Sequence, residues 1–156
     1  MLREAYEHLS PESRRRRFLG TVPHLTRAML DHLVDEVDGV DHVALVLVVI
    51  SDDHEGVPVG LARMIRYADD PTAADVAVTV VDEWQGRGVA TALLAELVRE
   101  RPEGVTHIVT TVAADNAASL AMLARLGTVA STPVEDNRVD VRIDLTPPAL
   151  EAQPGT

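Results

Sequence analysis

Cysteine and lysine are both absent from this sequence of 156 residues. Without cysteine the chain can form no disulfide bond and has no thiol that could act as a nucleophile. All 14 basic residues are arginine, so the only free amine on the protein is its N-terminus. Long apolar runs are absent too, because the longest, residues 43–50, is far too short to span a bilayer.

Basic charge is scarce, with 14 basic against 25 acidic residues and a net charge of −11. General nucleic-acid binding needs basic surface to replace counterions, so that class of function is excluded. An apolar content of 46% fits a globular protein, and the length fits one domain with a proper core. The first residues are charged and lack a signal-peptide core, which predicts a cytoplasmic protein without membrane contact. The six histidines show no metal-ligand spacing, so no metal is expected.

The most informative stretch runs from residue 76 to residue 98. Its first part, 76–81, is a β-branched run with apolar residues at alternate places, as in a strand. A polar connection with Gly86 and Gly88 follows. The last part has apolar residues at helical spacing, namely Val89, Leu93, Leu94, Leu97 and Val98. Strand, glycine turn and helix in this order place unpaired N–H groups at the positive end of a helix dipole, where anions bind.

The spacing of small residues in this turn narrows the choice of ligand. The turn is not the dinucleotide Gly-x-Gly-x-x-Gly, since Ala90 comes only two places after Gly88, and no Lys-Ser or Lys-Thr follows as in a Walker loop. Instead, Gln85-x-x-Gly88-x-Ala90 resembles the pyrophosphate-binding signature of the GNAT superfamily of N-acetyltransferases, usually Gln/Arg-x-x-Gly-x-Gly/Ala. The alternative is an ordinary strand-to-helix turn in which glycine allows close packing.

The other elements are predicted from periodicity and from Gly and Pro positions. Because a helix separates the strand near 74–81 from the strand near 105–112, these two strands should be parallel. The first long strand, 41–50, is continuously apolar from Val43, which predicts burial on both faces. Helices are expected over 2–9, 11–19 (ending at Gly20), 21–38, 87–100 and 116–127, and further strands over 58–67, 128–134 and 138–145.

This order of elements resembles the GNAT core over nearly the whole chain. The resemblance implies an α/β fold with a mixed, mostly antiparallel sheet, a splayed central pair of parallel strands, and helices on both faces. We expect one domain over residues 1–146, with acceptor-side helices in 1–39 and the cofactor-binding core in 40–146, and a flexible tail over 147–156. The segment from Leu9 to Phe18 is similar to the acceptor-side helices of bacterial protein-lysine acetyltransferases.

The resemblance implies acetyl-CoA as co-substrate. The backbone of Val78 and Val80 would pair with the pantetheine arm as a neighbouring strand would, and the glycine turn would hold the pyrophosphate. Asn116-x-x-Ser119 occupies the family's Asn-x-x-Ala/Ser position, where the Asn bonds the pantetheine arm or the acceptor region; a helix cap is the alternative role for Asn116. The expected cofactor-binding residues are Val78, Val80, Gln85, Gly86, Arg87, Gly88, Val89, Ala90, Thr91, Asn116 and Ser119.

An amine acceptor must lose a proton. Lysine has a reference pKa of ~10.4, so deprotonation at pH 7 costs ~4.6 kcal/mol, part of which a nearby carboxylate can offset. Ala74-Asp75-x-Ala77 resembles the Ala-Glu-x-Ala of the protein acetyltransferase branch, whose Glu is taken as the base, and this makes Asp75 the expected catalytic residue. The alternative is a solvated acid at the strand edge. Leu123 stands where many members carry a Tyr that protonates the leaving thiolate.

These residues together predict an N-acetyltransferase that moves the acetyl group of acetyl-CoA to an amine by direct attack in a ternary complex. The preferred acceptor is a protein lysine. A small-molecule amine acetyltransferase and a non-catalytic acyl-CoA-binding regulatory module are the alternatives. The oligomeric state stays open between a monomer and a homodimer.

Overall fold

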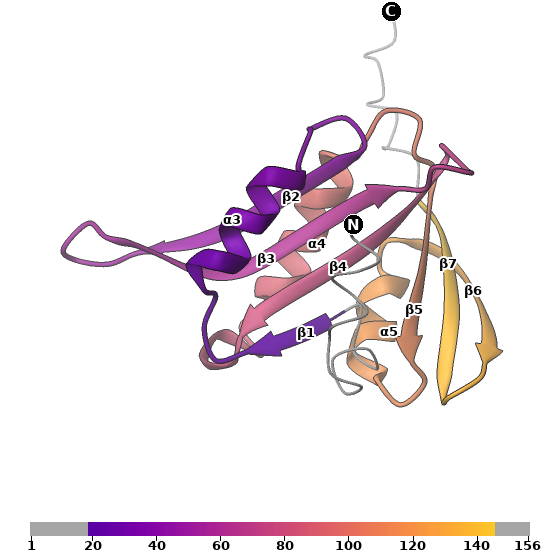
Figure 1. Ribbon diagram of the computed structural model, residues 1–156. Helices are drawn as coiled ribbons and strands as arrows, with labels where there is room; N and C mark the ends of the chain where they lie inside the picture. The colour runs from indigo at the N-terminus through magenta and orange to yellow at the C-terminus, as the bar shows by residue number, and fades with distance from the viewer. Residues whose placement is uncertain (1–18, 146–156) are drawn as a thin grey trace, which may run out of the picture.

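The computed structural model describes residues 19–145, with side chains from residue 22 onward (Figure 1). The helices expected over 2–9 and 11–18 and the tail over 147–156 lie outside these residues. The elements, in chain order, are β1 (Leu19–Val22), α3 (Arg27–Glu36), β2 (His42–Ile50), β3 (Gly56–Arg66), β4 (Ala73–Val81), the short 3-10 helix η1 (Asp82–Trp84), α4 (Val89–Arg99), β5 (His107–Ala113), α5 (Ala117–Ala124), β6 (Gly127–Val134) and β7 (Arg138–Leu145).

Seven strands form one mixed sheet. Its main path runs β2-β3-β4-β5-β7-β6, and β1 pairs with β4 outside that path. Among the described strands, only β4 with β5 and β1 with β4 are parallel, while the other neighbours are antiparallel. The sheet is therefore mixed and mostly antiparallel with a central parallel pair, as predicted.

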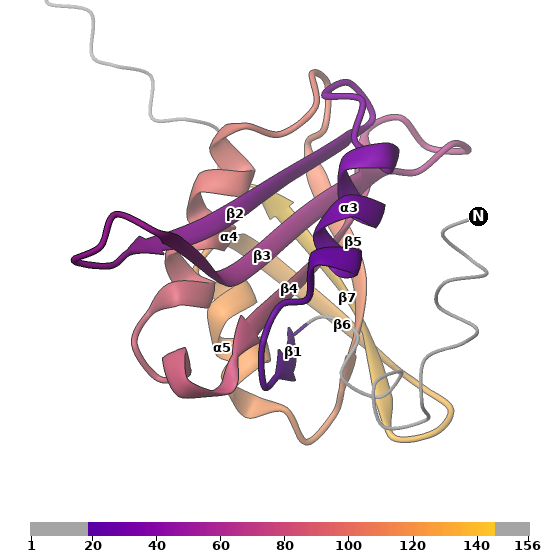
Figure 2. The ribbon, with the colours of Figure 1, turned by 60° about the vertical axis from the view of Figure 1, so that its left-hand side comes forward.

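Helices cover both faces of the sheet (Figures 1 and 2). On one face, α4 and α5 bury their leucines against the alternating valines of β4 and against β5 and β7. On the other face, α3 adjoins a smaller cluster in which Leu25, Val59 and Val81 are buried. The alternation of strand side chains between these faces decides which residues of β4 point toward α4 and which point away from it.

The N-terminal part of the fold differs from its prediction. A helix was expected over 21–38, but α3 begins only at Arg27, after Thr26, whose Oγ1 accepts a hydrogen bond from the Met29 N–H at 3.2 Å. The helix predicted to end at 19 is also wrong there, because Leu19–Val22 is a strand. Val22 precedes Pro23, and a residue before proline is disfavoured in the helical region, so the chain is extended at this point.

Strand β2 is not buried on both faces as its apolar run suggested. It is an edge strand, and Val46, Val48 and Ile50 are 39%, 44% and 64% exposed. Of the intervening residues, Leu47 packs against both the main core and the smaller cluster, and Val49 packs against the smaller cluster. The uninterrupted apolar run thus belongs here to an edge strand with one face partly exposed to solvent.

Close packing of β3 against α4 depends on Gly60. A Cβ added at Gly60 would lie 2.8 Å from Leu93 Cδ1 and 2.8 Å from Val89 Cγ1. We expect Gly60→Val to lower the free energy of unfolding by about 1–3 kcal/mol through overpacking, and Gly60→Ala to lower it by less. Urea denaturation monitored by circular dichroism measures both variants. Wild-type stability in Gly60→Val would contradict this account of the β3–α4 contact.

Candidate functional site

The central parallel strands β4 and β5 part soon after they begin. They pair only at Ala73 with His107 and at Ala74 with Ile108. Asp75 is the first β4 residue beyond these pairs, and it is half-buried. Since Val76 is buried in the core on the α4 side, the alternation of the strand turns Asp75 toward the opposite face. The carboxyl group predicted as the base therefore lies at the corner where the two strands separate.

Beyond this corner, β4 continues to the glycine turn. The side chains of Val78 and Val80 are buried in the core, so only their backbone groups can contact a ligand. One edge of this segment pairs with β3. The other edge pairs with β1, with Leu19 opposite Val78 and Thr21 opposite Val80. The backbone expected to bind pantetheine is thus paired with the chain's own first described strand.

The glycine turn has the geometry of an anion-binding loop. Gly86 and Gly88 have φ angles of +70° and +79°, which residues with a Cβ rarely adopt. Gly88 is the N-cap of α4 and supplies no side-chain cap to the N–H groups of the first turn. A Cβ at either glycine would meet no atom within 4 Å. The turn therefore presents backbone donors and the positive end of α4 to an open surface.

The turn itself carries a positively charged side chain, that of Arg87. The Arg87 guanidinium lies over the Trp84 ring, with its Cζ 4.6 Å from the ring centroid. This contact keeps an arginine charge beside the N-terminus of α4. Gln85 is exposed within the turn, and Asp82 and Glu83 are exposed in η1. Of the first α4 residues, Val89 is buried and Ala90 and Thr91 are half-buried, so the latter two offer mainly backbone to the turn.

The N-terminus of α5 carries the second predicted contact region. Asn116 is the N-cap, and its Oδ1 accepts a hydrogen bond from the Ser119 N–H at 3.1 Å. This cap uses the amide oxygen and leaves the Nδ2 donors for other partners. Ser119 is fully buried, and its Oγ has no hydrogen-bond partner among the described residues. Leu123 is fully buried in the core, so no phenol stands at its position.

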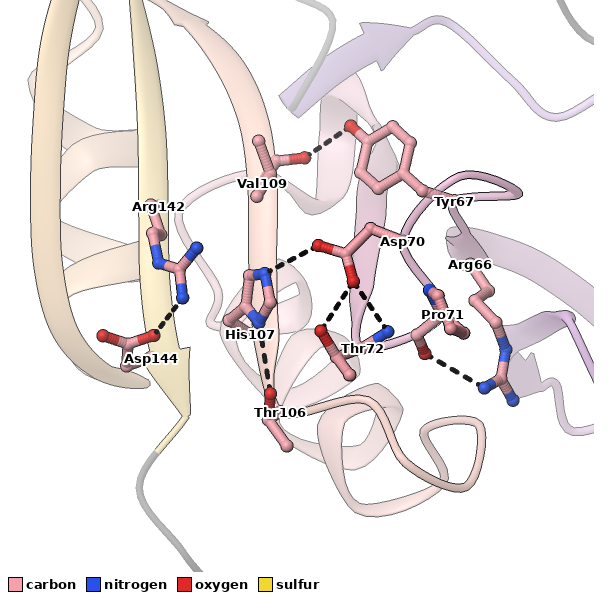
Figure 3. Close-up of polar contacts among 10 residues, drawn as sticks. All are labelled: Arg66, Tyr67, Asp70, Pro71, Thr72, Thr106, His107, Val109, Arg142 and Asp144. Carbon is pink, nitrogen blue, oxygen red and sulfur yellow. Dashed lines mark hydrogen bonds and ion pairs between the residues drawn. The ribbon is translucent and has the colours of Figure 1, made fainter.

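The corner between β4 and β5 is held by the loop that precedes β4 (Figure 3). The Tyr67 hydroxyl donates a hydrogen bond of 2.7 Å to the carbonyl oxygen of Val109. Val109 lies in β5, two residues after His107, which pairs with Ala73 of β4. The Thr106 and His107 N–H groups both donate to the Thr72 carbonyl. Tyr67 could not be identified from the sequence, because nothing in its local pattern shows that its side chain crosses to β5.

His107, the first residue of β5, is buried. Its Nε2 lies 3.5 Å from Asp70 Oδ2, and its Nδ1 lies 3.1 Å from Thr106 Oγ1 (Figure 3). Hydrogen bonds from the Thr72 hydroxyl and N–H lower the pKa of the Asp70 carboxyl, with a smaller contribution from His107. Within residues 19–145 no three His, Asp or Glu side chains gather to hold a metal ion. This network joins the two strands at their paired end.

Residues 3–128 of the sequence match the acetyltransferase (GNAT) family. The chain belongs to this family. The mixed sheet with its central parallel pair and with helices on both faces is thus the GNAT fold. None of the helices in the described part of this GNAT chain is long and apolar enough to cross a membrane.

Three relatives extend this identification. The acetyltransferase Pat of Mycolicibacterium smegmatis is 37% identical over 121 residues, which cover 77% of this chain and 35% of that protein. The GNAT domain of S. lividans PAT superposes with a TM-score of 0.61 at 29% identity, covering 92% of this chain and 83% of that one. The structure of yncA from Salmonella typhimurium with its cofactor acetyl-CoA has a TM-score of 0.50 at 26% identity, over 60% and 62% of the chains. The chain spans about a third of the length of the Mycolicibacterium relative.

Proposed function

We propose that this GNAT chain transfers the acetyl group of acetyl-CoA to a primary amine, with a protein lysine as the preferred acceptor. The observation that carries the proposal is the uncapped glycine turn between β4 and α4. It follows the end of β4 at which this strand has parted from β5, because the two strands pair only at Ala73 and Ala74. The anion-binding donors of the turn therefore lie at one end of the separated β4 segment, and the carboxylate of Asp75 lies at its other end.

The residues present fit acetyl-CoA. Backbone N–H groups from Gly86 to Thr91 would hold the pyrophosphate, and Arg87 would add charge. The pantetheine arm would take the β4 edge at Val78 and Val80 and meet Asn116. The Ser119 hydroxyl is a buried polar atom without a hydrogen-bond partner in the part of the chain that the structure describes, as is expected beside a polar ligand group. The family relative whose structure holds acetyl-CoA supports this assignment.

The chemistry then requires one proton transfer by this chain's own residues. The amine nitrogen forms a bond to the thioester carbonyl carbon, and the carbon–sulfur bond breaks to release CoA as a thiolate. Asp75 takes one proton from the acceptor ammonium, directly or through one water, before its nitrogen attacks, and the second nitrogen proton passes to the CoA thiolate or to water as the amide forms. A thiol has a reference pKa of ~8.5, so the thiolate leaves at neutral pH without the phenol that Leu123 replaces. Backbone of β4 would polarise the carbonyl.

The protein-lysine acceptor rests on the similarity to Pat. A panel of lysine-containing proteins and small amines, each assayed for acetyl-CoA consumption, tests it. The proposal expects faster consumption with a protein acceptor than with equimolar small amines. Faster turnover of a small amine would instead make the chain a small-molecule amine acetyltransferase.

The absence of lysine allows a clean control on this chemistry. Incubation with acetyl-CoA should add no acetyl group to any side-chain amine of the protein, because the chain has none. Intact mass spectrometry followed by peptide mapping checks this result. An acetyl group mapped to an internal residue would contradict the proposed preference for amines.

A further inference from the structure

Strand β1 occupies the β4 edge that acetyl-CoA needs. It pairs in parallel with Val78, Thr79, Val80 and Val81 through Leu19 to Val22. The opposite edge of Val78, Thr79 and Val80 already pairs with β3. A strand has two edges, and the N–H and C=O groups of one edge cannot serve two partners at once.

We propose that β1 is a displaceable strand that closes the β4 edge, and that acetyl-CoA binds by taking its place. The inference rests on the proposed function, since it concerns the pantetheine part of that site. The competition involves backbone groups only. An amide-containing arm that pairs with β4 in strand fashion would use the donors and acceptors that β1 now uses.

The pairing of β1 is local and one-sided. β1 has four residues, and among the described strands it pairs with β4 alone. In Figures 1 and 2 it runs beside the lower part of β4. Its last residue, Val22, packs on the cluster of Leu25 and Val81, and Leu25 is buried. The Val22 end is therefore anchored next to α3, so β1 can leave the edge from Leu19 without unfolding the main core.

Displacement has a quantitative consequence for affinity. If acetyl-CoA binds only when β1 is off the edge, the apparent dissociation constant equals the intrinsic constant divided by the fraction of open molecules. Any change that weakens β1 without touching β4 must then tighten binding. A merely structural β1 would give no such gain.

A pair of prolines tests this competition. In a parallel ladder only one of two neighbouring residues directs its N–H to the partner strand, so Gly20→Pro with Thr21→Pro removes one such donor whichever residue carries it. The double alanine variant, Gly20→Ala with Thr21→Ala, keeps both N–H groups and is the control. Titration calorimetry should show acetyl-CoA binding the proline variant at least about threefold more tightly than wild type, and the alanine variant within twofold of wild type.

Hydrogen exchange of the wild-type protein gives an independent measurement. On saturation with acetyl-CoA, amides of residues 19–22 should exchange faster, while amides of residues 78–81 should remain protected by their new partner. Unchanged or greater protection of 19–22 would overturn the proposal, as would equal or weaker binding by the proline variant. Absence of any acetyl-CoA binding by wild type and both variants would instead refute the proposed function itself.

Discussion

Replacing Gly88 with glutamate should abolish acetyl-CoA binding, with an affinity loss of at least about 100-fold. The added side chain would enter the open space in front of the α4 N-terminus. There it would place a carboxylate where the pyrophosphate is proposed to lie, and like charges about 4 Å apart repel by about 4 kcal/mol at an effective dielectric constant of 20. Titration calorimetry with acetyl-CoA measures the loss.

The backbone at Gly88 requires its own control. Its φ of +79° disfavours any residue with a Cβ, so Gly88→Glu and Gly88→Ala should both lose about 1–2 kcal/mol of stability. Only the glutamate variant adds charge and bulk. Gly88→Ala should therefore bind acetyl-CoA within a few-fold of wild type, provided that both variants are folded at the assay temperature. Equal acetyl-CoA affinities of the two variants would show that the pyrophosphate does not bind at this turn.

Replacing Asp75 with asparagine should reduce turnover by about 100-fold or more and leave acetyl-CoA affinity unchanged. Asparagine keeps the shape of the side chain but cannot accept a proton from the amine. Asp75 stands at the corner between β4 and β5 and is turned away from the core valines, so it lies apart from the glycine turn. Steady-state kinetics and calorimetry on the same preparations separate kcat from cofactor affinity.

Two further variants define the role of Asp75. The acid limb of the pH–rate profile should change in Asp75→Asn, whereas Asp75→Glu should retain the wild-type shape because its carboxylate still accepts a proton. Asp52→Asn, a matched change in the exposed β2–β3 loop, should leave kcat unaltered. Full turnover with the wild-type pH profile in Asp75→Asn would mean that Asp75 is a surface acid and that another group or solvent removes the proton.

The fold from residue 42 to residue 145 could be predicted from the sequence because local signals agree with tertiary structure there. The glycines at 86 and 88 set the boundary between β4 and α4 through backbone geometry that other residues rarely adopt. The turn that contains Pro71 separates β3 from β4, and the turn that contains Pro102 separates α4 from β5, both near the predicted ends of these elements.

Features that depend on distant partners could not be predicted. The four residues of β1 form a strand only through pairing with β4, some sixty positions along the chain, and their sequence permits a helix start equally well. The exposure of Val46 and Ile50 depends on β2 being an edge. The hydrogen bond from Tyr67 to Val109 joins the loop between β3 and β4 to strand β5, and no local sequence pattern relates the two segments. In each case the decisive partner lies far away in sequence.

Release of free CoA thiol from acetyl-CoA, followed with a thiol-reactive dye, tests the central claim most directly. Because the chain has no cysteine, it adds no thiol of its own to the dye signal, and acceptors without cysteine leave CoA as the one thiol released. The account predicts thiol release that requires an amine acceptor, saturates with acetyl-CoA and is lost in Gly88→Glu. Wild-type protein that binds acetyl-CoA in calorimetry but releases no thiol with any protein or small amine would contradict it, and the chain would then be an acyl-CoA-binding module without turnover.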